Sequence, residues 1–163
     1  MSAVRVTVPL GPWEVGGCAK GEGSQRPCLM VAGCQEGFQN RDLTGKVLSG
    51  VLLRGADFSG SKLVRVEMSR ADATGANLSG VDFTDANCYG TSFDGADLRD
   101  ANFENAILSS ASFGRDRSGT WANLRGTTFV GALVSSSDVQ RICENPTLLP
   151  ETRKSELGCR GGR

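Results

Sequence analysis

A repeat of period five runs through most of this 163-residue chain and limits what it can fold into. From Leu43 onward, every fifth position holds a large apolar residue, usually Leu or Phe, and a small residue, usually Ala, stands two places before it. The position between them is often Asp or Asn, and Gly is frequent two places after the large residue. Neither a helix, with apolar residues about every 3.6 positions, nor an alternating strand fits this pattern. A short strict period is typical of a solenoid.

If each five-residue unit forms one side of a square coil, four units complete a turn and residues twenty apart stack on one another. Asx and Gly residues supply the turn at each corner, and adjacent turns should lie about 4.8 Å apart, the ordinary spacing of paired strands. The large residues then form interior ladders. The predicted core residues are Leu43, Leu63, Phe83 and Phe103 in one ladder, Phe93 and Phe113 in another, and Leu124 and Phe129 in the last turn.

One interruption breaks the repeat between Phe113 and Leu124. These residues are eleven apart, where two units would give ten. We therefore expect one additional residue in this turn, with Leu124 still on the same face as Phe103. The intervening segment GRDRSGTW should form a surface bulge.

Solenoids need capped ends, because an open turn exposes unpaired backbone groups and apolar side chains. After Val134 the repeat stops, and the tail predicts two short helices. We expect Ser137 to be the N-cap of the first helix, Asn145-Pro146 to end it, and Pro150 to begin the second. The predicted segments are an irregular N-terminal arm or cap over 1–35, the β-helix over 36–135, and a helical C-terminal cap over 136–163.

The absence of histidine and the spacing of the six cysteines argue against catalytic and metal-binding functions. Histidine is the commonest general base and metal ligand, and the sequence has no C-x2-C pair of the kind that holds zinc. The carboxylates occupy the turn positions, where a structural role is the ordinary one. We therefore expect no enzyme activity, no cofactor and no metal site.

Disulfides formed in an oxidising compartment explain the number of cysteines better than a zinc site does. The turns in the tail let its second helix fold back on the first, which predicts a bridge between Cys143 and Cys159. Among Cys18, Cys28 and Cys34 at most one further pair remains, and Cys18–Cys34 is favoured because it would bracket the arm.

The repeat resembles that of the pentapeptide-repeat family, whose pattern is A(D/N)LXX, as in Ala76-Asn77-Leu78 and Ala96-Asp97-Leu98. The resemblance implies an all-β solenoid, a right-handed quadrilateral β-helix, to which the tail adds a short α-helical C-terminal cap. The tail segment Val139–Asn145, with Leu157-Gly158-Cys159, is similar to that of pentapeptide proteins of the chloroplast thylakoid lumen and their cyanobacterial relatives. It implies a location in the thylakoid lumen of a chloroplast, or in the lumen or periplasm of a cyanobacterium.

The leading functional hypothesis is a non-catalytic structural or protein-interaction module, with a lumen-side subunit or assembly factor of a photosynthetic membrane complex as the role that the resemblance implies. Lys+Arg and Asp+Glu are 18 each, which argues against a nonspecific nucleic-acid binder, and no apolar run is long enough for a membrane span. Candidate contact residues are Trp13 in the arm and Arg115, Arg117 and Trp121 in the bulge. The simpler interpretation of the bulge is that Trp121 covers the edge of the core and the arginines are solvated. The oligomeric state is left open.

Two other functions are weighed against this hypothesis. The quinolone-resistance pentapeptide proteins mimic DNA and bind topoisomerases as acidic rods, whereas residues 41–134 here carry eleven acidic and ten basic residues, which gives such mimicry little electrostatic basis. The second alternative is a lumenal protein regulated through thiol redox chemistry. Against it, the tail cysteines have no activating histidine and only Arg141 and Arg160 nearby, and Cys88 lies in the inward column, where a buried and inert thiol is expected.

Overall fold

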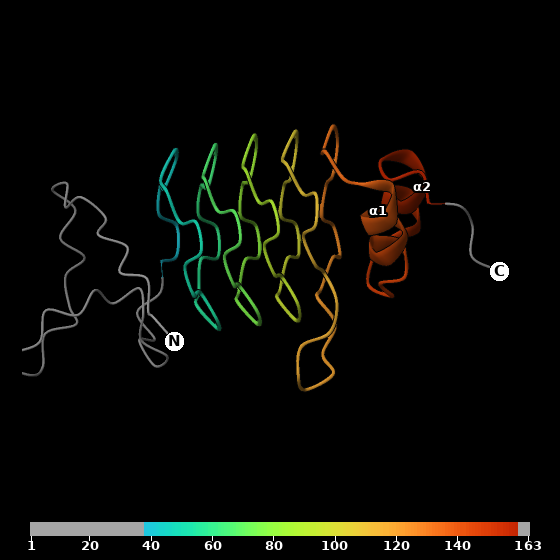
Figure 1. The fold of residues 1–163 in the computed structure, drawn as a ribbon, viewed down its shortest axis with the longest axis horizontal. Helices are drawn as coiled ribbons and strands as arrows, with labels where there is room; N and C mark the ends of the chain where they lie inside the picture. Colours follow the sequence, from blue (N-terminus) through green and yellow to red (C-terminus); the bar gives the residue numbers. More distant parts are fainter. Residues whose placement is uncertain (1–37, 160–163) are drawn as a thin grey trace, which may run out of the picture.

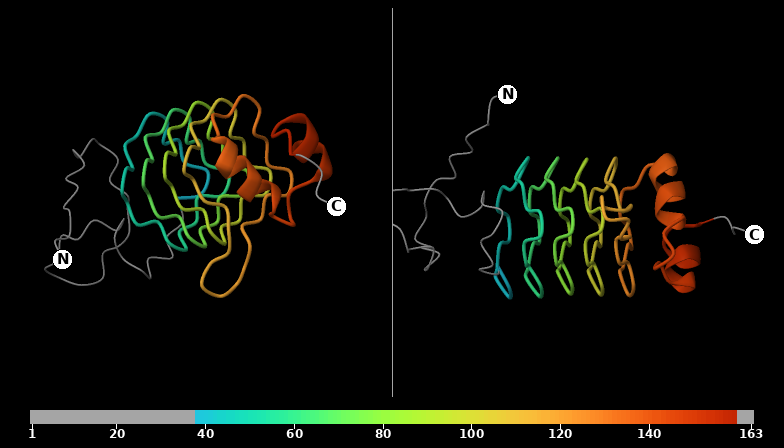
Figure 2. Two further views of the ribbon diagram at one scale, coloured as in Figure 1. Left: turned by 45° about the vertical axis from the view of Figure 1, so that its right-hand side comes forward. Right: turned by 90° about the horizontal axis from the view of Figure 1, so that it is seen from below.

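A four-sided coil closed by two helices forms the body of the molecule. The structure, a computed structural model, describes residues 38–159, so the predictions for the arm over 1–35, including Trp13, Cys18 and Cys34, lie outside the described residues. The helices are α1 (Ser136–Cys143) and α2 (Pro150–Ser155). Figure 1 shows the turns of the coil stacked side by side with both helices at the C-terminal end. Seen from below in Figure 2, the helices lie across the last turn as a cap.

Residues twenty apart pair in parallel on all four sides of the coil. The first turn pairs with the second through Asp42–Lys62, Val47–Glu67, Leu52–Asp72 and Asp57–Asn77, and the pattern continues to Ser92–Ser112. Each side contributes a single bridged residue per turn, because a corner every five residues leaves no room for a longer strand. The coil is therefore held together by isolated parallel bridges, and no residue between 38 and 159 belongs to a regular strand.

The corners are tight turns that use the Asx and Gly residues of the repeat. At one corner Val51 donates its N–H to the carbonyl of Leu48 at 3.2 Å, and Gly50 between them has φ of 67°. Such a turn needs positive φ at its third residue, which glycine adopts without strain. Where an Asx residue precedes a corner, its side chain can accept a backbone N–H two residues on, as Asp72 does from Thr74 at 3.1 Å. Asx and Gly residues thus form many of the corners, as predicted, while Arg65, Arg70 and Ser110 take the positive-φ position at others.

The interior contains the predicted ladders. Phe83 and Phe103 stack with ring centroids 4.7 Å apart, and Phe93 and Phe113 stack at 5.2 Å, close to the spacing expected for adjacent turns. Leu43 is only partly buried because it belongs to the first turn. The other predicted core residues are buried: Leu63, Phe83, Phe93, Phe103, Phe113, Leu124 and Phe129.

The register after the interruption differs from the prediction. Bridged residues are twenty apart up to Ser112 but 26 apart afterwards, as from Asn102 to Thr128. Six additional residues, rather than one, are therefore inserted in this turn. Phe129 stacks on Phe103 at 5.6 Å, and the expectation that Leu124 shares a face with Phe103 is wrong. The prediction is wrong because it places both five-residue units between Phe113 and Leu124 in the coil, whereas the chain leaves the coil after Phe113 and then returns to it.

The two helices begin close to where the sequence predicts. The N-cap of α1 is Ser135 rather than Ser137, because the Ser135 side chain accepts the N–H of Asp138 at 3.3 Å. Three consecutive serines make the position ambiguous in the sequence, and Asp138 decides it, because its Oδ2 accepts the Ser135 hydroxyl at 2.5 Å. Helix α2 begins at Pro150, as predicted.

Candidate interaction surface

The interruption of the repeat is a β-hairpin over residues 114–122, which projects from the coil at the lower edge of Figure 1. Arg115 and Trp121 form an antiparallel bridge. Ala122 donates its N–H to the carbonyl of Gly114 at 2.9 Å, so the chain returns to the coil next to the point where it left. The predicted surface bulge is therefore a paired element with its own hydrogen bonds. We call it the 114–122 hairpin.

A single carboxylate fixes the tip of the hairpin. Oδ1 of Asp116 accepts the Ser118 hydroxyl at 2.6 Å and the backbone N–H groups of Ser118 and Thr120, both at 2.9 Å. The bond from the Ser118 hydroxyl, followed by that from the Thr120 amide, lowers the pKa of Asp116 below its ordinary value. The hairpin thus holds its conformation through an ionised side chain of its own.

The base of the hairpin is seated on the preceding turn of the coil at Gly95. This residue has φ of 66°, and a Cβ built on it would lie 2.6 Å from the Cβ of Asp116. Gly75, at the same corner one turn earlier, has the same φ, yet a Cβ there would meet nothing within 4 Å. Next to the seat, the Gly114 N–H donates to Oδ1 of Asp94 at 2.7 Å. Gly95 is therefore needed for close approach as well as for its φ.

The hairpin brings three of the predicted contact residues together. The guanidinium carbon of Arg115 lies 4.7 Å from the centroid of the Trp121 ring, within the range of a cation–π interaction. Trp121 is half-buried, and Arg115 and Arg117 are exposed. Both arginines are exposed, in keeping with the expectation that they are solvated, and Arg115 in addition lies over an aromatic face. The fourth candidate, Trp13, lies outside the described residues.

An open groove of about 480 Å³ runs between the hairpin and the side of the coil, and we call it the hairpin groove. The coil lines it from three successive turns, so residues about twenty apart in sequence face the same space. The lining residues are Arg54, Asp72, Thr74, Ser92, Asp94, Arg115, Asp116, Arg117 and Ser118.

The three carboxylates of the groove are all engaged within the protein. Arg54 donates to Asp72, with Nη2 and Oδ2 2.5 Å apart. Asp94 accepts the Gly114 N–H, and Asp116 closes the hairpin tip. Partial burial would raise the pKa of Asp72, but the hydrogen bond from Arg54, assisted by Thr74, more than offsets it and the pKa is lowered. All three carboxylates therefore already accept hydrogen bonds from groups of the protein itself.

The helical cap ends the coil through side chains that replace the missing next turn. Asn145, which is fully buried, donates through Nδ2 to two backbone carbonyls, and three other cap side chains accept backbone N–H groups. The pairs are Asn145 with Phe113 and Ala122, Thr147 with Leu124 at 2.8 Å, Glu156 with Phe129 at 2.5 Å, and Asp138 with Ser110 at 2.8 Å. Sequence analysis assigns Asn145 to the end of the first helix and leaves the capping contacts of all four residues unpredicted.

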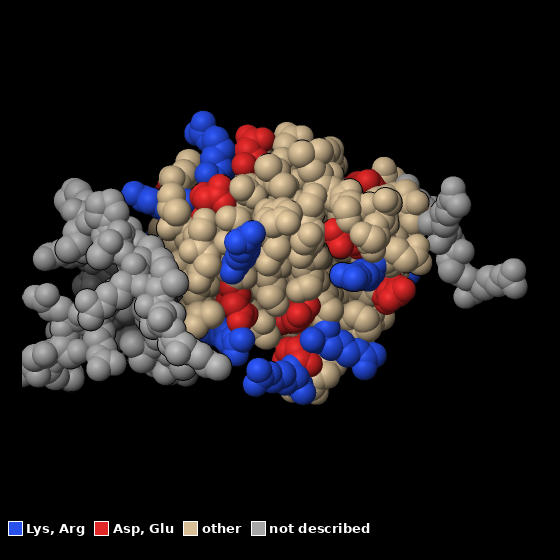
Figure 3. Space-filling model, viewed as in Figure 1, with Lys and Arg blue, Asp and Glu red and all other residues tan. Residues whose placement is uncertain are grey.

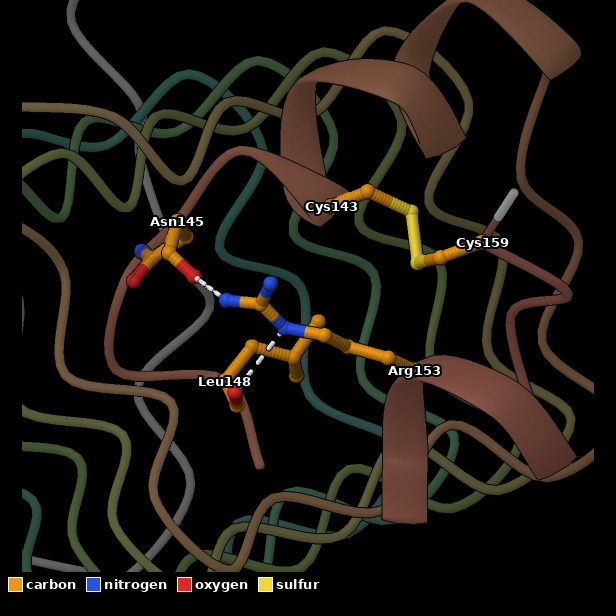
Figure 4. Close-up of a disulfide and its surroundings, with 5 residues drawn as sticks. All are labelled: Cys143, Asn145, Leu148, Arg153 and Cys159. Carbon is orange, nitrogen blue, oxygen red and sulfur yellow. Dashed lines mark hydrogen bonds between the residues drawn. A yellow bond between two sulfur atoms is a disulfide. The ribbon is translucent and has the colours of Figure 1, made fainter. Parts of the chain in front are cut away.

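A disulfide joins Cys143 and Cys159, as the sequence predicts, with a Cα–Cα distance of 5.8 Å. Figure 4 shows it linking the end of α1 to the segment after α2, beside Arg153. Arg153 donates to the carbonyls of Asn145 at 2.6 Å and Leu148 at 3.0 Å and so holds the connection between the helices. The cap is thus fixed covalently as well as by hydrogen bonds.

Cys88 is buried in the inward column and has no disulfide partner. Burial, and to a lesser degree the charge of Glu67, raises the pKa of its thiol. The prediction of a buried thiol at this position is confirmed.

Comparison with protein families matches eight copies of the pentapeptide repeat to this chain, over residues 38–70, 52–87, 61–100 and 86–115. The chain belongs to the pentapeptide-repeat family. The fold of that family is a right-handed quadrilateral β-helix, in agreement with the four-sided coil. No curated protein sequence gives a significant match.

Several solved pentapeptide-repeat structures are similar to this chain. HetL of Nostoc sp. strain PCC 7120, involved in heterocyst differentiation regulation, is 28% identical with a TM-score of 0.51, over 61% of this chain and 39% of HetL. The Rfr23 protein of the cyanobacterium Cyanothece 51142 is 25% identical with a TM-score of 0.44, over 60% of this chain and 58% of its own. A pentapeptide repeat protein of the Arabidopsis thaliana thylakoid lumen is 26% identical with a TM-score of 0.28, over 76% and 92%. The chain therefore spans under two thirds of the length of the first two.

Between 38 and 159 no helix has the length and apolar character needed to cross a membrane. Within the same range, no three His, Cys, Asp or Glu side chains are grouped so that they could hold a metal ion.

Proposed function

We propose that this pentapeptide-repeat protein is a non-catalytic module that binds a protein partner, and that the 114–122 hairpin is its contact surface. The observation that carries the proposal is the ordered hairpin itself. Its six additional residues extend no ladder of the core, yet they are closed by Asp116 and seated on Gly95. What they present is an arginine stacked on a tryptophan, and these two residue types are enriched at protein interfaces.

The solenoid suits this role because it presents the hairpin on a rigid body. Successive turns are hydrogen-bonded on all four sides up to the Asp97–Asn123 pair, and the last, partial turn is closed by the cap. Functional groups mounted on a rigid scaffold lose little conformational entropy when a partner binds. The hairpin is therefore ordered before it meets a partner.

We further propose that the protein works in the thylakoid lumen of a chloroplast, or in the lumen or periplasm of a cyanobacterium. The resemblance of its tail supports this location, and so does the Cys143–Cys159 disulfide, because disulfides form and persist in oxidising compartments. The partner that this location supplies is a photosynthetic membrane complex with a lumenal surface. The protein would serve such a complex as a lumen-side subunit or assembly factor.

The structure offers less support for the two alternatives. Figure 3 shows Lys and Arg interspersed with Asp and Glu on the visible face, rather than the continuous acidic surface that a DNA mimic presents. A redox-regulated protein needs an accessible reactive thiol, and the Cys88 thiol is buried with a raised pKa. Among the described residues, the tail disulfide is left as the site for such regulation.

Affinity purification from gently solubilised thylakoids of the source organism, with cross-linking mass spectrometry, tests the proposed function. We expect a lumenal or lumen-exposed protein to copurify with the tagged chain. The matched variants are Arg115→Gln/Arg117→Gln, which alters the hairpin, and Arg65→Gln/Arg70→Gln, which removes the same charge from exposed corners of another turn. Copurification of a gyrase without any thylakoid protein would contradict the proposal. The proposal would also be contradicted if the wild type and both double variants recovered the same proteins in equal amounts and an unrelated bait captured those proteins too.

A further inference from the structure

We propose that the hairpin groove binds an acidic segment of the partner protein, whose carboxylates accept hydrogen bonds from Arg115 and Arg117. This inference rests on the proposed function, since it names the chemistry of the partner at the same surface. It follows from which hydrogen-bonding groups of the groove are engaged and which are free.

Each carboxylate of the groove accepts a hydrogen bond within the protein, whereas the guanidinium groups of Arg115 and Arg117 donate none to any described residue. Asp72 is paired with Arg54, and both Asp94 and Asp116 accept hydrogen bonds within the protein. In contrast, Arg117 forms no hydrogen bond or ion pair with any residue between 38 and 159. A ligand in the groove would therefore meet guanidinium N–H groups that are not hydrogen-bonded within the described residues, whereas each carboxylate already accepts at least one hydrogen bond. That asymmetry favours an anion.

Arg115 is oriented for such a contact by Trp121. The guanidinium carbon lies over the indole ring, 4.7 Å from its centroid, and the guanidinium N–H groups form no hydrogen bond with any described residue, so they are available to a ligand. Those N–H groups match the two oxygens of a carboxylate in a fork geometry. The contact would be largely pre-organised, because the Arg115–Trp121 pair is bridged in the hairpin backbone.

The anion is expected to belong to a protein rather than to a nucleic acid. The three arginines and three aspartates of the groove balance in formal charge, so the surface lacks the basic excess that phosphate backbones require. A cavity of about 480 Å³ falls within the range of ordinary binding pockets and leaves room for a short stretch of extended chain. A short acidic segment of a protein, whose carboxylates bind Arg115 and Arg117, fits both the balanced charge and the size of the groove.

Fluorescence anisotropy with a fluorescein-labelled hexaglutamate peptide at low ionic strength tests the inference, with hexaglutamine as the neutral control peptide. The wild-type protein should bind hexaglutamate and not hexaglutamine. Binding should weaken about tenfold or more in Arg115→Gln/Arg117→Gln, since two charge-assisted hydrogen bonds are lost. It should be nearly unchanged in the charge-matched Arg65→Gln/Arg70→Gln. Equal weakening in both double variants would show general charge attraction and would overturn the inference, as would failure of the wild type to bind.

A second readout locates the peptide. The indole N–H signal of Trp121, assigned in a ¹H–¹⁵N spectrum by its loss in Trp121→Phe, should shift on addition of hexaglutamate. A peptide that binds without moving that signal occupies another surface, which would also overturn the inference. These results can be told apart from those that test the proposed function. If Arg115→Gln/Arg117→Gln still recovers the partner, the proposed function stands and the groove is not the binding site. If hexaglutamate binds the groove but no lumenal protein copurifies, the groove binds acidic peptide and the proposed function is contradicted.

Discussion

Alanine at position 95 should destabilise the protein more than alanine at position 75, although the two glycines occupy the same corner in consecutive turns. Both have φ of 66°, so both substitutions impose left-handed backbone strain of about 1–2 kcal/mol. Only at 95 does the new methyl group meet a neighbour, because it would lie 2.6 Å from the Cβ of Asp116, against nothing within 4 Å at 75. The comparison therefore isolates the seating of the hairpin.

The additional cost at position 95 follows from what must move. The Cβ of Asp116 is fixed to the hairpin backbone, so a rotamer change cannot relieve the contact and the hairpin must shift from its seat. The shift would break the bond from the Gly114 N–H to Asp94, worth about 0.5–1.5 kcal/mol net. We therefore expect the free energy of unfolding to fall by about 1–2 kcal/mol for Gly75→Ala and by about 1 kcal/mol more for Gly95→Ala.

Urea unfolding followed by far-ultraviolet circular dichroism measures both variants. The difference should appear as a lower midpoint for Gly95→Ala, with the dependence on urea concentration unchanged. Hexaglutamate should bind Gly75→Ala as it binds the wild type and should bind Gly95→Ala more weakly. If the two variants unfold within about 0.3 kcal/mol of one another, the hairpin is not seated on Gly95 and the argument for a pre-organised contact surface fails.

Three further predictions concern the core and the cap. Phe93→Asp would bury an unpaired charge among stacked rings and should abolish cooperative folding. The exposed control Arg99→Ala should change the free energy of unfolding by under about 0.5 kcal/mol. A cooperative thermal transition in soluble Phe93→Asp would show that Phe93 does not face the interior. Reduction of the tail disulfide should lower the free energy of unfolding by up to about 3 kcal/mol, and identical urea curves with and without reductant would contradict this. Hydrogen bonds from the Ser135 hydroxyl and the Ser110 amide lower the pKa of Asp138 in the folded protein, so its stabilisation is present above the ordinary aspartate pKa of about 3.9 and is lost as the pH falls through the folded value. Asp138→Asn should accordingly lose less stability than the wild type between pH 5 and pH 3, and parallel losses would disprove the linkage.

The sequence predicts the coil well because the period of the repeat is itself the geometry. A large residue every fifth position and a corner at every Gly or Asx determine which residues stack, and Phe83 on Phe103 follows without knowledge of any distant contact. The tail disulfide could be predicted for a similar reason, since two turns between Cys143 and Cys159 bring the two cysteine-bearing segments back together.

The hairpin and the cap contacts depend on groups that the local pattern does not encode. A spacing of eleven between Phe113 and Leu124 is compatible with one residue extra in the coil or with a unit outside it. The second arrangement prevails because Asp116 closes the tip and Gly95 admits it, and these residues come from different turns. The roles of the cap side chains, such as Asn145 bonded to two carbonyls, require knowing which backbone groups the last turn leaves open.

Hydrogen–deuterium exchange in the purified partner complex shows whether the partner contacts the 114–122 hairpin. We expect the backbone amides of residues 117–121 to exchange more slowly in the complex than in the free protein. The corner at residues 104–105, which lies on a different edge of the coil, should exchange at the same rate in both states. Slower exchange at that corner or in α1, with no change in the hairpin, would contradict the claim.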